Sequence, residues 1–241
     1  MSVWMLIGVT FLLAGLVKGV IGMGLPTVAM GLLALVLPPA EAAAVLVVPS
    51  LVTNVWQLMA GPAFGALMRR LWPMMLAVLI GTIAGAGVLA GNVSGLAKIG
   101  LGITLALYSV VGLAGFRWSI APRHESWWGP TVGVTTGLVT GATGVFVIPA
   151  VPYLQAIGLE KDELIQALGL SFTVSTVALA VGLLRVDAWQ MDTVWISLLA
   201  LVPALAGMQA GQWLRSRIPA ATFRKVFFAG LLLLGATLAL A

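Results

Sequence analysis

Residues 15–22 read GLVKGVIG and residues 137–144 read GLVTGATG, so five of the eight positions are identical at a constant offset of 122. At the same offset, Glu163 repeats Glu41. Similarity within one chain at a fixed spacing indicates an internal duplication. The sequence therefore predicts two halves of related structure.

The second part of each half repeats as well. The stretch GTIAG at 81–85 corresponds to GMQAG at 207–211, now at an offset of 126, so a four-residue insertion lies between the two matches. A polar linker separates the halves. We expect one integrated transmembrane domain that is built from a first membrane repeat, a linker and a second membrane repeat at 1–115, 116–126 and 127–241.

The composition indicates that the chain lies in a bilayer. Hydrophobic residues make up 61% of the chain and charged residues only 8%, against about 25% charged residues in soluble domains. A membrane-spanning helix needs ~20 mainly apolar residues. Each half has four apolar segments, at 1–37, 41–60, 71–91 and 96–115, and at 127–158, 163–184, 193–213 and 221–241. The sequence predicts an all-α, multi-pass protein of the cell inner (plasma) membrane.

The first apolar segment of each half is too long for one crossing and contains helix-breaking residues. Proline removes a backbone donor and glycine disfavours the helix interior, so neither segment should form one continuous helix. The residues expected to break it are Gly22, Gly24 and Pro26 in the first half, and Gly144, Pro149 and Pro152 in the second. Each half should thus be a broken hairpin segment followed by three transmembrane helices.

The loop charges favour one topology. If each broken segment goes in and returns, Lys98 and Arg185 lie on one side and the other nine loop Lys and Arg residues on the opposite side. If each broken segment crosses once, the division is five to six and carries no bias. The first reading predicts inverted repeats, both termini outside and a cytoplasmic linker at 116–126. Whether the broken segments are re-entrant or cross twice stays open.

Several classes of protein are disfavoured. The net charge of +5 is spread over short loops rather than one face, so we expect no nucleic-acid partner. The chain has no cysteine, and His124 in the linker is its only histidine. We therefore expect no metal site and no cofactor. Because the spans contain no histidine, cysteine or paired aspartates, we do not expect an enzyme.

The glycines at the breaks are candidates for binding an anion. Where a helix is interrupted, amide groups lose their partners, and glycine lets an anion approach them near the positive end of a helix dipole. Secondary transporters with inverted repeats bind substrate at such breaks. The candidates are Gly19, Gly22, Gly24, Gly141 and Gly144. The alternative is close helix packing, which we favour for Gly81, Gly85, Gly87, Gly91, Gly207 and Gly211.

Polar residues within apolar stretches are further candidates. Lys18 could supply a cation for the anion, since a charge at membrane depth is costly and usually functional; alternatively, it reaches the interface. Neutral side chains in the second apolar segment of each half could bind anion oxygens or form hydrogen bonds between helices. These residues are Asn54 and Gln57 in the first half, and Ser171, Ser175 and Thr176 in the second.

Glu41 and Glu163 each begin a helix after a loop. An acidic residue there favours the helix dipole, so capping is the preferred interpretation. A carboxylate beside a transport pathway can also relay protons, which leaves a coupling role open.

Five motifs carry a resemblance to a known family. They are GVIGMG at 19–24, PPAEA at 38–42 and SLVTNVWQ at 50–57, and in the second copy GLVTGATG at 137–144 with GLEK at 158–161. In this order they resemble the TauE/SafE sulfite exporter family over essentially the whole chain. The resemblance implies a permease for sulfite, thiosulfate, sulfoacetate or a related organosulfur anion, with two repeated halves.

The sequence thus supports a secondary transporter or exporter of a small anion, with proton coupling open. The alternative is a membrane scaffold or assembly factor without transport activity. Because GxxxG faces also join subunits, a homodimer is conceivable.

Overall fold

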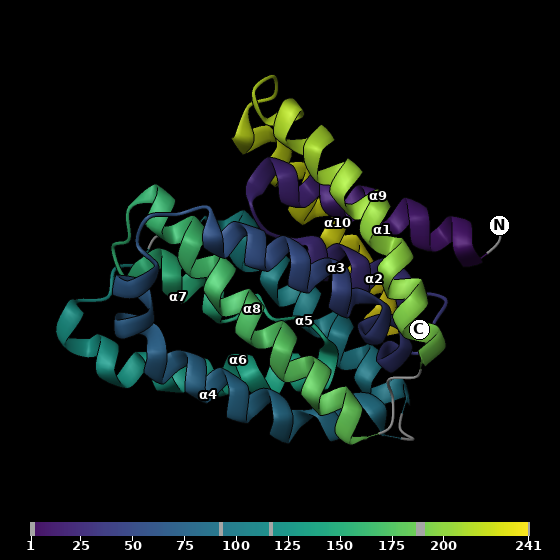
Figure 1. Cartoon of the computed structure of the whole chain (residues 1–241), viewed down its shortest axis with the longest axis horizontal. Coiled ribbons are helices and arrows are strands. Elements are labelled where there is room, and N and C mark those ends of the chain that lie inside the picture. Colours follow the sequence, from purple (N-terminus) through teal and green to yellow (C-terminus); the bar gives the residue numbers. More distant parts are fainter. Residues whose placement is uncertain (1–2, 92–93, 116–117, 187–190, 241) are drawn as a thin grey trace.

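The computed structural model describes residues 3–91, 94–115, 118–186 and 191–240, and in these residues it contains helices and no strand (Figure 1). The first half comprises α1 (Val3–Ile21), α2 (Leu25–Leu33), α3 (Pro39–Met59), α4 (Phe64–Ala90) and α5 (Ser94–Ala114). A single 3-10 turn, Pro122–His124, precedes the second half. The second half comprises α6 (Glu125–Thr143), α7 (Ala150–Ala156), α8 (Lys161–Arg185), α9 (Met191–Arg215) and α10 (Ala220–Leu240).

Seven helices in the described residues are long and apolar enough to cross a membrane: α1, α3, α4, α5, α8, α9 and α10. They expose large apolar side chains, such as Val202 at 70% and Leu233 at 72%. Apolar surface of this extent requires a bilayer or a partner to cover it. The prediction of an all-α, multi-pass membrane protein is confirmed.

Both predicted helix breaks are present. α1 ends at Ile21, and Gly22 and Gly24 adopt positive φ angles of 77° and 102°, a conformation that suits glycine. Pro26 then lies in the first turn of α2, where a missing N–H costs nothing. In the second half, α6 ends at Gly144 with φ of 72°, and the chain stays non-helical until α7.

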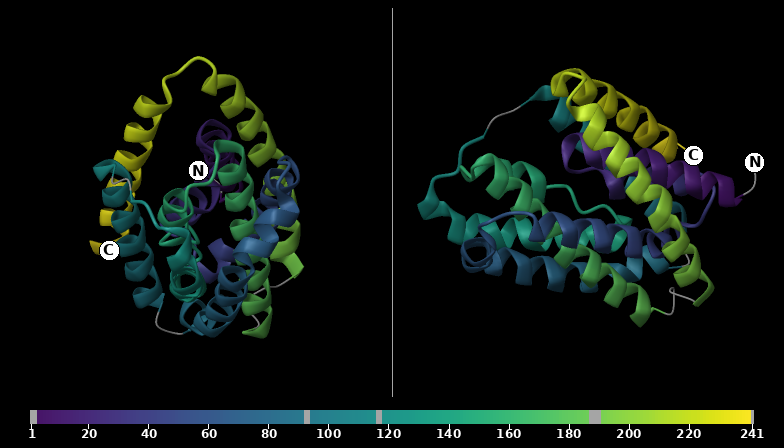
Figure 2. Two further views of the ribbon diagram at one scale, coloured as in Figure 1. Left: turned by 90° about the vertical axis from the view of Figure 1, so that its left-hand side faces the viewer. Right: turned by 45° about the horizontal axis from the view of Figure 1, so that its top comes forward.

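The two halves are interleaved rather than side by side. α1 packs on α9 and α6 packs on α4, while α5 pairs with α10 and α3 with α8. Figures 1 and 2 show α9 crossing α1 and α6 following α4. The duplication relates α1 to α6 and α9 to α4. The α1–α9 contact and the α6–α4 contact are therefore equivalent contacts in the two repeats. A two-fold relation between the halves would produce this pattern; their inverted orientation stays a prediction.

Glycines make these equivalent crossings possible. A Cβ added at Gly81 would lie 2.6 Å from Val134 O, and one at Gly137 would lie 2.5 Å from Val78 O, so α4 and α6 meet backbone to backbone. The α1–α9 crossing is equally close. The packing role is what the structure shows for Gly81, Gly85, Gly207 and Gly211. It does not hold for Gly87, which has open space around it, or for Gly91, which meets only the preceding turn of its own helix.

Candidate anion-binding site

Lys18 lies in the last turn of α1, just before the first break, and is only 4% exposed. Its Nζ donates to Thr53 Oγ1 at 3.1 Å and to Asn54 Oδ1, both on α3. The side chain therefore turns inward and does not reach the interface. A cation at the C-terminus of a helix is favoured by the helix dipole, but both of its side-chain partners are neutral.

Asn54 continues the contact toward the second half. Its side chain is fully buried, and its Nδ2 donates to Thr176 Oγ1 on α8 at 3.3 Å. Thr176 Oγ1 in turn donates to Phe172 O at 2.7 Å within its own helix. These hydrogen bonds link α1, α3 and α8. Asn54 and Thr176 occupy equivalent positions in the two repeats, at the 122-residue offset.

The position of Thr53 and Asn54 depends on a proline inside α3. Pro49 cannot donate to Val45 O, as a helical residue would. Ser197 of α9 supplies the missing bond: its Oγ donates to Val45 O at 2.7 Å and accepts from Val48 N at 3.1 Å. The break in the ladder of α3 is therefore repaired from another helix, one turn before the polar chain.

Three buried hydroxyl groups without a hydrogen-bond partner lie on α3 and α8, and others lie on α1, α4 and α6. Ser50 precedes Asn54 by one turn of α3, and Ser171 and Ser175 lie one turn apart on α8 beside Thr176. All three serines are fully buried. Because buried polar groups are nearly always hydrogen-bonded, these hydroxyls are available to a ligand or to water. Ser50 was missed in the sequence, although its spacing from Asn54 could have indicated it.

Gln57 binds the neighbouring helix. Its Nε2 donates to Ile165 O at 2.8 Å, while its Oε1 is buried without a partner. From the other side, Gln166 donates to Leu58 O and Gly61 O at 2.8 Å each and accepts from Ala63 N. The two glutamines join α3 and the loop after it to the first turns of α8. Sequence reasoning did not single out Gln166.

The five candidate glycines fall into different environments. Gly19 and Gly141 lie in the close helix crossings, against Met208 O and Thr82 O respectively, and packing accounts for them. The amides of Gly22 and Gly144 donate to the carbonyls of Lys18 and Thr140, both at 2.8 Å. These four positions offer an anion little free backbone.

The start of α2 is buried and has no side-chain cap. Gly24 precedes it in a left-handed conformation. The amides there are the part of the predicted amide site that stays available. The second break is close by, since a Cβ at Gly144 would come within 2.8 Å of Met30 Cε on α2. The stretch that follows Gly144 runs through the core, and Val145, Phe146 and Val147 are fully buried.

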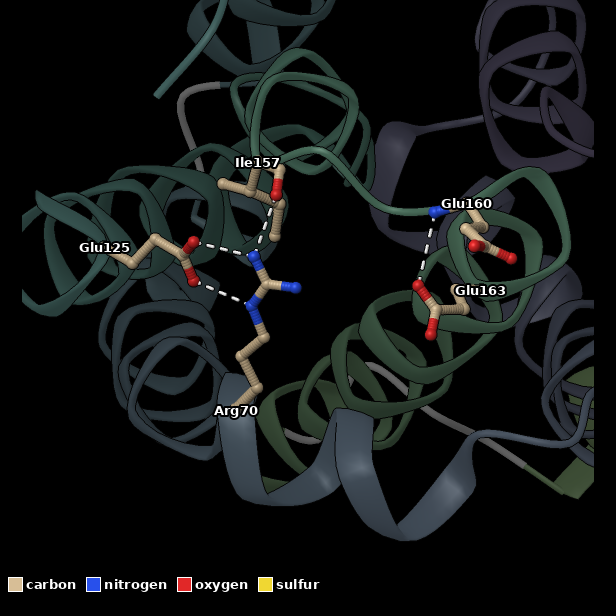
Figure 3. Close-up of polar contacts among 5 residues, drawn as sticks. All are labelled: Arg70, Glu125, Ile157, Glu160 and Glu163. Atoms are coloured by element: carbon tan, nitrogen blue, oxygen red, sulfur yellow. Dashed lines mark hydrogen bonds and ion pairs between the residues drawn. The ribbon is translucent and has the colours of Figure 1, made fainter. Parts of the chain in front are cut away.

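Glu163 forms a capping box at the start of α8. Its Oε2 accepts from Glu160 N at 3.2 Å, while the Glu160 side chain accepts from the backbone of Glu163 (Figure 3). Glu41 is exposed in the first turn of α3. Both positions suit the dipole interaction expected from the sequence.

Arg70 forms a contact that the sequence did not indicate. Its guanidinium binds both oxygens of Glu125 at 2.8 and 2.7 Å and also donates to Ile157 O at 2.8 Å (Figure 3). Within the described part of the chain this is the only ion pair. Glu125 begins α6 and Ile157 follows α7, so the second broken segment starts and ends at the same point on α4.

The family described as Sulfite exporter TauE/SafE matches residues 7–238, nearly the whole chain. No curated protein and no solved structure matches.

Proposed function

The chain belongs to the sulfite exporter TauE/SafE family, which is a family of transporters; from this premise we propose that it carries a small sulfur oxyanion or organosulfonate and binds it beside Lys18. The proposed site comprises the Lys18 ammonium, Asn54, the buried serine hydroxyls of α3 and α8, and the uncapped first turn of α2. Sulfite, thiosulfate and sulfoacetate are the first substrates to test.

The observation that carries this proposal is a buried ammonium group with neutral side-chain partners. A charge at membrane depth is costly, and a buried cation is normally paired with an anion. Lys18 is 4% exposed and its side-chain partners are Thr53 and Asn54. An incoming anion would supply the missing negative charge.

The unpartnered serine hydroxyls of α3 and α8 suit an oxyanion. Ser50, Ser171 and Ser175 each have a hydroxyl that can donate. Hydrogen bonds to a charged acceptor are roughly twice as strong as neutral ones. Asn54 has a different task, because its Oδ1 accepts from Lys18 and its Nδ2 donates to Thr176. We assign it the positioning of the ammonium.

Alternating access would come from movement of the broken segments. Met30 of α2 lies next to Gly144, and both α2 and the stretch after Gly144 follow a left-handed glycine that can act as a hinge. We propose that the protein lies in the inner membrane as two inverted repeats, with both termini outside and the linker in the cytoplasm. If transport is coupled to protons, we propose that Glu41 and Glu163 carry them. If the protein is oligomeric, we propose a homodimer.

Uptake into proteoliposomes tests the function. Purified protein should accumulate radiolabelled thiosulfate, sulfite or sulfoacetate well above empty liposomes. Lys18→Gln should reduce initial uptake by ten- to hundredfold, as loss of a hydrogen bond to a charged group costs about 1.5 to 3 kcal/mol. Lys98→Gln, which removes a charge in the first turns of α5, should transport normally. Absence of uptake for all three anions by folded protein would overturn the proposal.

A further inference from the structure

A cluster of basic residues surrounds the turn between α9 and α10. Arg215 ends α9, Arg217 lies in the turn, and Arg224 and Lys225 follow in the second turn of α10. All four residues are exposed. Figures 1 and 2 show this turn at one extremity of the molecule, away from the α4–α6 pair.

No acidic residue balances this charge. The sequence contains no Asp or Glu between residues 193 and 241. In the described residues, the only ion pair is the one between Arg70 and Glu125, so none of the four basic residues has a carboxylate partner there. The positive end of the α10 dipole adds to their charge, and its first turn has no acidic residue. The turn therefore attracts anions.

Two of the arginines are held in place. The Arg217 guanidinium stacks on the Trp213 ring at 3.7 Å from the centroid, and Trp213 is 57% exposed. Arg224 donates to Gly112 O near the end of α5 at 3.2 Å. Tryptophan favours the level of the lipid headgroups. The stacked pair thus places a guanidinium at the depth where lipid phosphates lie.

The surface below the turn suits acyl chains. Val226 and Leu233 on α10 are 68% and 72% exposed, and Leu199 and Val202 on α9 are 61% and 70% exposed. A phospholipid could lie with its tails along the apolar surface of either helix and its phosphate against the basic turn. Free phosphate could contact the basic turn but has no tails to cover the apolar surface.

We propose that the α9–α10 turn is a binding site for an anionic phospholipid, with Arg215, Arg217 and Lys225 facing the headgroup. Basic residues beside a membrane helix attract acidic headgroups, and each contributes to the affinity. The site is separate from the anion pocket at Lys18. Its occupancy is expected to stabilise the protein whether or not the chain transports sulfur oxyanions.

Native mass spectrometry of the full-length protein in detergent tests this proposal. Wild-type protein should bind phosphatidylglycerol and retain it under conditions that remove phosphatidylcholine. Arg215→Gln with Arg217→Gln should weaken phosphatidylglycerol binding about thirtyfold. The matched control, Arg69→Gln with Arg123→Gln, removes the same charge elsewhere and should bind as the wild type does. Should the first pair not fold, the exposed Lys225→Gln alone should weaken binding about fivefold.

Three results would overturn the proposal. The first is equal retention of phosphatidylglycerol and phosphatidylcholine. The second is that the control pair weakens phosphatidylglycerol binding as much as the first pair does. The third comes from thermal unfolding of the same protein, if inorganic phosphate raises the melting temperature as much as phosphatidylglycerol does. The last result would mean that the turn binds the free anion rather than a lipid. None of these results bears on uptake, so the transport proposal is judged separately.

Discussion

Lys18 and Thr140 occupy matching positions in the two repeats, yet only the first carries a charge. Thr140 Oγ1 donates to Thr136 O at 2.7 Å within α6, so it needs no partner from another helix. Lys18 reaches across to α3 instead. The charge of the proposed site therefore comes from one half, while Thr176 of the other half binds Asn54 beside it.

Asn54→Asp is the sharpest change at this scale. It would place a carboxylate against the Lys18 ammonium and cancel the positive charge that should attract the substrate. We expect anion uptake to fall at least tenfold while the melting temperature is kept or raised, because a buried ion pair replaces a charge–dipole contact. Uptake by Asn54→Asp at the wild-type rate would show that Lys18 does not hold the anion.

The positions of candidate residues were predictable where they depend on the local pattern. Lys18 and Asn54 stood out because they interrupt apolar runs, and the structure brings them together. Ser197 and Gln166 did not stand out, since their importance comes from Pro49 and from loop carbonyls far away in sequence. Gly19 and Gly141 belong to the same sequence motif as the helix breaks. Their packing role could not be predicted, because it depends on contact with another helix.

At the scale of elements, α3 depends on a bond from α9. Ser197→Ala would leave Val45 O and Val48 N without their partner, and we expect a loss of about 1 to 2 kcal/mol in the free energy of unfolding. Pro49→Ala restores an N–H that can reach Val45 O, so the double variant should lose less than the sum of the two single changes. Thermal unfolding in detergent measures all three. Additive losses would show that Ser197 does not compensate for Pro49.

The contact of Arg70 with Glu125 and Ile157 closes the second broken segment. Arg70→Gln should release the end of α7, and hydrogen exchange over residues 150–158 should accelerate about fivefold, since a partly exposed ion pair is worth about 1 kcal/mol. Exchange over α2 should stay unchanged. Arg69→Gln, at the neighbouring exposed arginine, is the control. Equal exchange in both variants would show that the contact does not restrain α7.

The two breaks themselves could be foreseen, because glycine and proline act locally and the duplication shows them twice. The contact at Arg70 could not, since Arg70 and Glu125 look like ordinary loop charges in the sequence. They meet only once α6 has packed along α4. That packing also brings the ends of the second broken segment together at Arg70, as expected both of a re-entrant hairpin and of two crossings.

At the scale of the molecule, the equivalent crossings of α1 with α9 and of α6 with α4 fit a two-fold relation between the halves, whose opposite orientation is a prediction. Because the chain has no cysteine, single cysteines can test the predicted topology. Ala241→Cys should react with a membrane-impermeant thiol reagent in intact cells, and Ser119→Cys in the linker only after permeabilisation. Labelling in the reverse order would refute the topology with outside termini.

The proposed function depends on an oxyanion that binds beside the buried ammonium of Lys18. A crystal structure with selenite measures this directly, because selenium gives an anomalous signal. We expect a peak within hydrogen-bond reach of Lys18 Nζ, near the serines of α3 and α8, and no such peak in Lys18→Gln. A peak found only at the basic turn between α9 and α10, with Lys18 still bound only to Thr53 and Asn54, would refute the proposed site.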